Sequence, residues 1–166
     1  YKDKDIAHGV LDSKTGGRMH VYFLRHLTGQ LLNQGRFVEA EAVAREAVLS
    51  ILPLYGRYSS HTARVLELLA SSIFGQGRYP EAEQLALSTI DTLLLGGVTS
   101  DSKTLAVSRN LQADIWASQG HWKKAIKAYT KIREDMASDK ATYEQYLAGN
   151  LNWVLAYLKI GEITKS

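Results

Sequence analysis

The sequence predicts an all-α protein in which antiparallel pairs of helices stack side by side as a repeat array, an α-solenoid. The first observation is a phrase that occurs three times: Gln34-Gly35-Arg36-Phe37, Gln76-Gly77-Arg78-Tyr79 and Gln119-Gly120-His121-Trp122. The glycines of successive copies are 42 and 43 residues apart, and such regular spacing is typical of stacked helix–turn–helix units. The second observation is that apolar residues recur at spacings of three and four on both sides of each glycine, which predicts paired amphipathic helices.

A weaker fourth copy of the phrase is Ile160-Gly161-Glu162-Ile163. The pattern predicts helices at about residues 18–34, 37–52, 60–76, 79–95, 102–119, 122–137 and 140–160. These pair into three full repeats at about 18–57, 58–99 and 100–138, and a truncated fourth at 139–166. Residues 1–17 are predicted to be an N-terminal tail or the remnant of a preceding repeat, so that the array covers residues 18–166.

Small side chains recur at fixed distances from each glycine. The position five residues after the glycine is always alanine, at Ala40, Ala82 and Ala125. Helices that cross closely need small residues at the crossing point and bulky residues around it. We therefore expect these alanines to lie in the core. The glycine itself is expected to adopt a left-handed turn conformation, which it can do at little steric cost.

The predicted helix ends carry residues that favour caps and turns. N-cap residues precede the first helix of later repeats, at Ser59-Ser60, Asp101-Ser102 and Ser138-Asp139. Pro80 lies in a predicted first turn, where its missing amide proton is harmless. Two second helices are expected to end at Pro53 with Gly56 and at Gly96-Gly97.

Composition excludes several classes of protein. The chain has 166 residues, about one domain, with 45% apolar and 22% charged residues, as in ordinary globular proteins. A net charge of +3 is too small to indicate nucleic-acid binding, and the lack of cysteine excludes disulfides and thiolate metal sites. No apolar run approaches the roughly 20 residues that would span a bilayer. We expect a cytoplasmic protein that is part of a longer chain.

The segment Arg78 to Glu83, Arg-Tyr-Pro-Glu-Ala-Glu, follows directly on a Gly-Gln-Gly turn. Together with the recurring glycines and alanines, this segment resembles the tetratricopeptide repeat family over about residues 18–163. The most similar subclass is that of kinesin light chains, whose units are as long as the 42-residue spacing seen here. Their first helices open on a His-Pro-x-Thr-like motif, to which His61-Thr62 and Lys103-Thr104 are similar.

The third repeat departs from the family pattern, because Arg109 and Gln112 replace expected apolar residues. The resemblance implies a right-handed superhelix whose first helices line a concave groove that holds an extended peptide or a partner's helix. Counting by turns from the packing residues, we expect a partner-binding face made of nine residues. They are Tyr22, Arg25, His26, Arg64, Glu67, Ser71, Asn110, Asp114 and Asn152. Arginine and asparagine are suited to binding a peptide backbone.

Catalytic, cofactor and metal sites are not expected. The five histidines show no ligand spacing with a carboxylate, and phosphate-loop and nucleophile-elbow motifs are absent. Lys123, Lys127 and Lys131 form a basic stripe on one predicted helix face, but such a stripe is more often solvated than bound to RNA. Nucleic acid is therefore an unlikely partner.

The sequence thus favours a scaffold that binds a peptide or protein through its concave surface and is not an enzyme. The alternative is a regulatory or sensor segment of a larger enzyme or NTPase whose catalytic part lies elsewhere. A third possibility is self-association through open array ends, where Trp153, Tyr157 and Ile160 would be partly uncovered.

Overall fold

A computed structural model describes the backbone of residues 2–136 and 151–163, and the side chains of residues 15–136 and 154–161. Every regular element in these ranges is a helix, and no strand occurs among them. The helices are α1 (Lys2–Asn33), α2 (Phe37–Tyr55), α3 (Ser60–Gly75), α4 (Tyr79–Leu95), α5 (Lys103–Ser118), α6 (Trp122–Asp135) and α8 (Leu151–Ile163). The all-α prediction is confirmed for the described chain.

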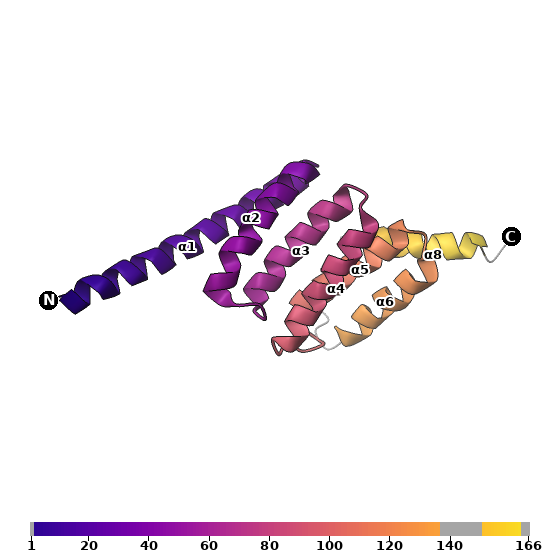
Figure 1. The fold of residues 1–166 in the computed structure, drawn as a ribbon. Coiled ribbons are helices and arrows are strands. Elements are labelled where there is room, and N and C mark those ends of the chain that lie inside the picture. The colour runs from indigo at the N-terminus through magenta and orange to yellow at the C-terminus, as the bar shows by residue number, and fades with distance from the viewer. Residues whose placement is uncertain (1, 137–150, 164–166) are drawn as a thin grey trace.

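Helices that follow one another in the sequence also pack against one another. Contacts join each consecutive pair from α1·α2 to α5·α6, and α8 contacts α6 and α5. Figure 1 shows the helices following each other from α1 at one end of the molecule to α8 at the other. The odd-numbered helices also touch across the intervening helix, in the pairs α1·α3 and α3·α5. This second set of contacts brings the first helices of neighbouring pairs side by side.

The turns between paired helices have the predicted geometry. Gly35, Gly77 and Gly120 adopt φ angles of 71°, 76° and 79°, in the left-handed region. The amide after each glycine donates to the carbonyl five residues earlier, in the bonds Arg36 N–Leu31 O, Arg78 N–Ile73 O and His121 N–Trp116 O. This is the Schellman arrangement, which satisfies carbonyls at a helix end. Gly161 differs, because it lies inside α8, and the predicted fourth turn is wrong.

The core lies where the alanine pattern places it. Ala40, Ala82 and Ala125 are completely buried. One cluster combines Ala44 of α2, Leu69 and Ile73 of α3, Ala82 and Ala86 of α4, and Ile115 of α5. Its side chains come from four helices and three predicted repeats, so the core is shared between neighbouring pairs.

The predicted start of the first helix is wrong. We expected it near residue 18, after Gly16-Gly17, but α1 runs without interruption from Lys2. A mid-helix glycine costs only about 1 kcal/mol relative to alanine. Gly17 also lies against Leu54 of α2, whose side chain comes within 3.3 Å of where a Cβ would be. The helix α1 therefore continues through Gly16 and Gly17, and at Gly17 it packs against α2.

The second helix also ends later than expected. Pro53 lies inside α2, which continues to Tyr55. A proline inside a helix lacks the amide that would donate to the carbonyl four residues earlier, and Pro53 is exposed. Gly56 then ends the helix with a φ of 73°, and its amide donates to Leu52 O at 2.9 Å.

Other helix ends agree with the predictions. Ser59 caps α3, with its Oγ accepting from the Thr62 amide at 3.1 Å. Ser102 occupies the N-cap of α5 without a side-chain bond, and Pro80 lies in the first turn of α4. Gly96 ends α4. Ser138-Asp139 fall outside the described residues.

The C-terminal helix is only partly packed. The sequence predicts a partly uncovered apolar face around Tyr157, and 47% of Tyr157 is exposed, as are large parts of Val154, Leu155 and Leu158. Among residues 154–161, Ala156 is fully buried, against α5 and α6. In the described part of the chain, no helix covers the opposite face of α8. A search of the described helices also finds none with the length and apolar character of a bilayer span.

Candidate functional site

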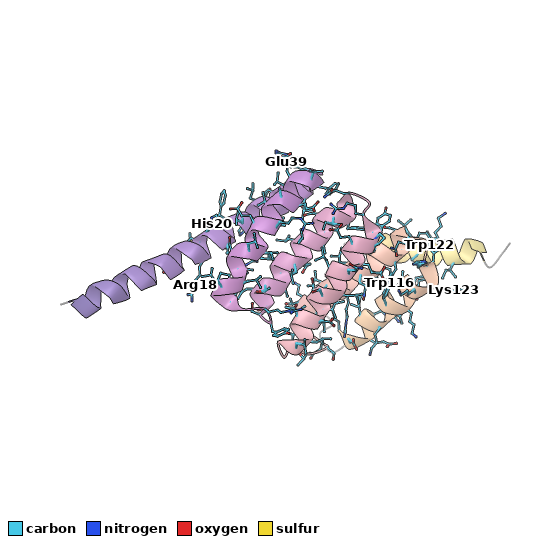
Figure 2. All side chains as sticks on the ribbon, in the orientation of Figure 1. Arg18, His20, Glu39, Trp116, Trp122 and Lys123 are labelled. Atoms are coloured by element: carbon cyan, nitrogen blue, oxygen red, sulfur yellow. The ribbon has the colours of Figure 1, made fainter. Side chains whose placement is uncertain are left out.

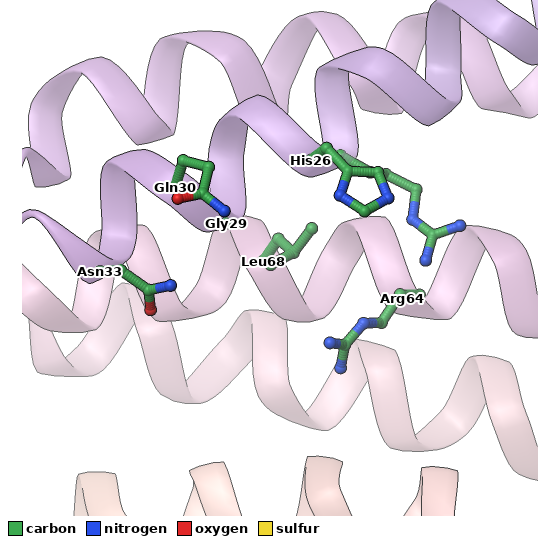
Figure 3. Close-up of a pocket in the computed structure, with 7 residues that line it drawn as sticks. His26, Gly29, Gln30, Asn33, Arg64 and Leu68 are labelled. Atoms are coloured by element: carbon green, nitrogen blue, oxygen red, sulfur yellow. The ribbon is translucent and has the colours of Figure 1, made fainter.

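A hollow of about 180 Å³ lies between α1 and α3. Two helices line it, and Figure 3 shows their side chains around the opening. The lining residues are Arg25, His26, Gly29, Gln30 and Asn33 of α1, and Arg64 and Leu68 of α3. Leu68 supplies an apolar surface among polar groups. Three of the nine predicted partner-binding residues, Arg25, His26 and Arg64, therefore meet at one place.

The repeat explains why these residues meet. Arg25 and Glu67 both lie ten residues before a turn glycine, and His26 and Leu68 both lie nine before it. Residues at equal distances from the turn occupy the same face of equivalent helices. Since α1 and α3 pack side by side, their equivalent faces open toward the same side.

Some of the charged groups around the hollow have hydrogen-bond partners and one does not. Glu67 is buried, with 7% of its surface exposed, and its Oε1 accepts from Arg64 Nη1 at 2.7 Å. Arg25 also attracts this carboxylate. Within the described structure, the buried Nε of Arg25 has no hydrogen-bond acceptor. A buried donor without a partner is costly, so this nitrogen is an unsatisfied group of a residue that lines the hollow.

Burial dominates the titration of Glu67. It raises the pKa of Glu67 above its usual range, although the charge and hydrogen bond of Arg64, and the charge of Arg25, act in the opposite direction. A folded protein with a raised carboxyl pKa binds its proton more readily than the unfolded chain does. Stability therefore falls as pH rises through the range between the two pKa values.

We predict that Glu67→Gln makes the protein more stable than wild type at neutral pH, because the amide removes a buried charge. The difference should shrink as pH is lowered toward about 4.3, the pKa of an ordinary glutamate, because the folded protein takes up the Glu67 proton above that pH. Thermal melts across this range measure it. Glu39→Gln is the control of opposite sign, because the hydrogen bond from Arg36 lowers the pKa of Glu39. A difference for Glu67→Gln that does not change with pH would contradict the prediction.

The remaining predicted residues lie elsewhere on the first helices. Tyr22 is exposed and its ring lies tilted against that of His26, with centroids 4.2 Å apart. Ser71 is half-buried on α3. Asn110 donates to Asp114 at 3.1 Å, and Asp114 in turn accepts from the Tyr129 hydroxyl of α6.

Asp114 and Asn110 are thus part of the packing between α5 and α6, which their sequence positions did not reveal. Asn152 belongs to α8, but its side chain lies outside the described residues, as does that of Trp153. The two unusual residues of the third repeat are also accommodated. Gln112 is buried, and Arg109 Nη1 pairs with Asp135 Oδ2 of α6 at 2.8 Å.

The basic stripe of α6 is partly neutralised. Lys131 pairs with Asp135 at 2.7 Å, and this hydrogen bond raises the pKa of Lys131. Lys124, beside the stripe, lies over the Trp116 ring at 4.0 Å and pairs with Glu83 at 3.5 Å. Lys123 and Lys127 are exposed, and Figure 2 shows Lys123 at the start of α6 near Trp122. The stripe therefore presents less free charge than its sequence suggests.

Four lining residues, Gly29, Gln30, Asn33 and Leu68, were not among the nine predicted residues. Gly29 lies six residues before its turn glycine, in the same register as Ser71 and Asp114, so the repeat alignment contained the signal. Nothing lies within 4 Å of where a Cβ of Gly29 would be. The missing side chain therefore helps to open the hollow. Among the described residues, no group of three or more histidine, aspartate or glutamate side chains is arranged to hold a metal ion.

The sequence was compared with family models and with curated proteins. No family model matches the chain, and a search of curated proteins finds no significant match.

Proposed function

We propose that this chain is a tetratricopeptide-type docking module that binds an extended peptide or a segment of a partner protein. The binding centre would be the hollow between α1 and α3. In this proposal the protein acts by recognition and catalyses no reaction. The observation that supports it most strongly is the convergence of polar donors from two neighbouring first helices on one opening, where the Arg25 Nε has no acceptor.

The chemistry of the lining fits a peptide. Arginine donates through a rigid fork, and asparagine can donate to a carbonyl and accept from an amide of the same backbone. Arg25, Arg64 and Asn33 provide these groups, while Leu68 can contact an apolar side chain. A mixed polar and apolar groove of this kind is common in peptide recognition.

The repeat also supports a solenoid arrangement for the array, and the family resemblance implies that its superhelix is right-handed. Equivalent turns have equivalent geometry at Gly35, Gly77 and Gly120, and α1, α3 and α5 contact one another in sequence. Rigid helices hold the lining side chains in place before a ligand arrives. Little free energy is then lost in ordering the receptor.

Gly29→Leu is expected to block peptide binding without harming the fold. The new side chain would enter open space in the hollow, and replacing a helical glycine is itself favourable by up to about 1 kcal/mol. Peptides selected from a random phage-displayed library on the wild-type protein should bind the variant at least about tenfold more weakly, since 1.4 kcal/mol corresponds to a factor of ten.

Ala42→Leu is the matched control for this experiment. Ala42 is exposed on α2 and does not line the hollow, so the same leucine there should leave peptide affinity unchanged. Selected peptides that bind wild type and Gly29→Leu equally well would move the docking site away from the hollow. Failure to select any peptide would count against the proposed function itself.

A further inference from the structure

Neighbouring repeats are joined by a glutamate that reaches into the next turn. Glu41 of α2 accepts hydrogen bonds from Gln76 Nε2 at 2.7 Å and Arg78 Nη1 at 2.6 Å. Burial alone would raise the pKa of Glu41. The hydrogen bonds from Gln76 and Arg45 and the positive charges of Arg78 and Arg45 outweigh burial, and the pKa of Glu41 is lowered. The carboxylate is thus held as an anion by the turn that follows.

The next pair of repeats uses the same position. Glu83 of α4, six residues after its turn glycine like Glu41, accepts from Trp116 Nε1 at 2.6 Å. Lys124 lies 3.5 Å from the same carboxylate. The bond from Trp116 is the main reason that the pKa of Glu83 is lowered. A second helix therefore places its carboxylate against the following repeat at both internal junctions.

The first turn has the same donors but no such carboxylate. Arg36 binds Glu39 of its own helix, and its Nη1 donates to Gln34 Oε1 at 3.2 Å. Arg78 binds Glu81 and Gln76 in the same way, and in addition binds Glu41. Among the described residues, no carboxylate from another helix pairs with Gln34 or Arg36. The position that Glu41 fills at the second turn is open at the first.

The adjoining face of α1 is also uncovered. Twelve residues before the turn glycine, Val65 of α3 is 0% exposed and Ser108 of α5 is 1% exposed, whereas Phe23 of α1 is 61% exposed. Val65 is buried in a cluster with Ala47 and Ile51 of α2. Met19, one turn before Phe23, is also largely exposed. The face that a preceding second helix covers on α3 thus presents large apolar side chains to solvent on α1.

The two internal covering helices share a pattern. Toward the next repeat α2 presents Glu41, Ala44, Ala47 and Ile51, and α4 presents Glu83, Ala86, Thr89 and Leu93. In both, a glutamate is followed at three and six residues by small side chains and at ten by isoleucine or leucine. These positions form one stripe of a helix, and the small residues permit close approach.

We propose that the face of α1 formed by Met19 and Phe23, together with Gln34 and Arg36, docks an amphipathic helix of a partner protein. That helix would carry the pattern Glu-x-x-small-x-x-small-x-x-x-Ile/Leu. Its glutamate would bind Arg36 and Gln34, and its small residues would pack on Phe23. Met19 and Phe23 lie on one stripe of α1 with His26 and Gln30, which line the edge of the hollow. The proposal does not depend on peptide binding in the hollow.

The test uses the α2 sequence as probe, because α2 covers the equivalent face of α3. A fluorescent peptide of residues 36–55 is stapled between positions 42 and 46, which are exposed in the array. The staple limits the cost of ordering a free helix. Anisotropy titrations should show saturable binding to the wild-type protein. Glu41→Ala in the peptide, or Arg36→Ala in the protein, should each weaken binding about tenfold, since bonds to charged groups contribute roughly 1.5–3 kcal/mol.

Combining both changes should cost little more than either alone, because each removes the same contact. Phe23→Asp should abolish binding, whereas Gly29→Leu in the hollow should leave it unchanged. Absence of binding to wild type, or binding that ignores Phe23→Asp and Arg36→Ala, would overturn the proposal. If the peptide fails to bind while the protein forms dimers that Phe23→Asp disrupts, the face belongs to a second copy of this chain and the partner-helix proposal is wrong.

Discussion

Ile73→Ala is expected to destabilise the protein by about 2–5 kcal/mol, the usual range for truncating a fully buried isoleucine. Ile73 is 0% exposed and lies in the cluster that α2, α3, α4 and α5 share. The variant loses contacts on three neighbouring helices, and each of those helices is fixed by its own turn. The surroundings can therefore collapse only partly around the cavity. Urea unfolding followed by circular dichroism measures the change.

Leu49→Ala is the control for Ile73→Ala. Leu49 lies in the middle of α2 but is 75% exposed, so its truncation should change stability by no more than about 0.5 kcal/mol. A comparable loss for both variants, or a negligible loss for Ile73→Ala, would mean that the helices do not share a core through α3.

Ala82→Leu should cost about 1–3 kcal/mol through overpacking. Ala82 is completely buried in the same cluster as Ala44 and Ile73. A leucine there must push apart helices that approach closely because the residue is small. The unfolding midpoint in urea should fall, and the slope of the transition should stay the same if the unfolded state is unchanged.

The matched substitution is Ala42→Leu, two residues further along its helix relative to the turn and exposed. This variant should have wild-type stability within about 0.5 kcal/mol. If Ala82→Leu is tolerated as well as Ala42→Leu, the alanine at the fifth position after each glycine has no packing role.

Local and periodic features of the fold could be predicted from the sequence. The left-handed glycines and the buried alanines follow from steric rules that act within one turn or one helix crossing. The same glycine and alanine occur in all three repeats, so the prediction rests on three copies of each. Helix ends that depend on other helices could not be predicted. Gly17 continues α1 while lying against Leu54, and no local pattern in the sequence indicates that contact.

The candidate site was predictable only as a set of positions. The distance of each residue from its turn glycine predicted which face of the first helix it occupies. The size and the hydrogen bonding of the side chains decide where that face forms a hollow. At six residues before the turn, Gly29 leaves space between α1 and α3, whereas Asp114 in the third repeat is engaged by Tyr129. The burial of Glu67 beside Arg64 likewise depends on how α3 meets its neighbours.

Backbone NMR of the protein titrated with a selected peptide tests the docking site most directly. We expect the amide resonances of Gly29, Gln30 and Asn33 to shift together with those around Arg64 and Leu68, while those of α6 stay in place. Shifts gathered on the lysines of α6 or on the exposed residues of α8, with the α1–α3 hollow unaffected, would contradict the account.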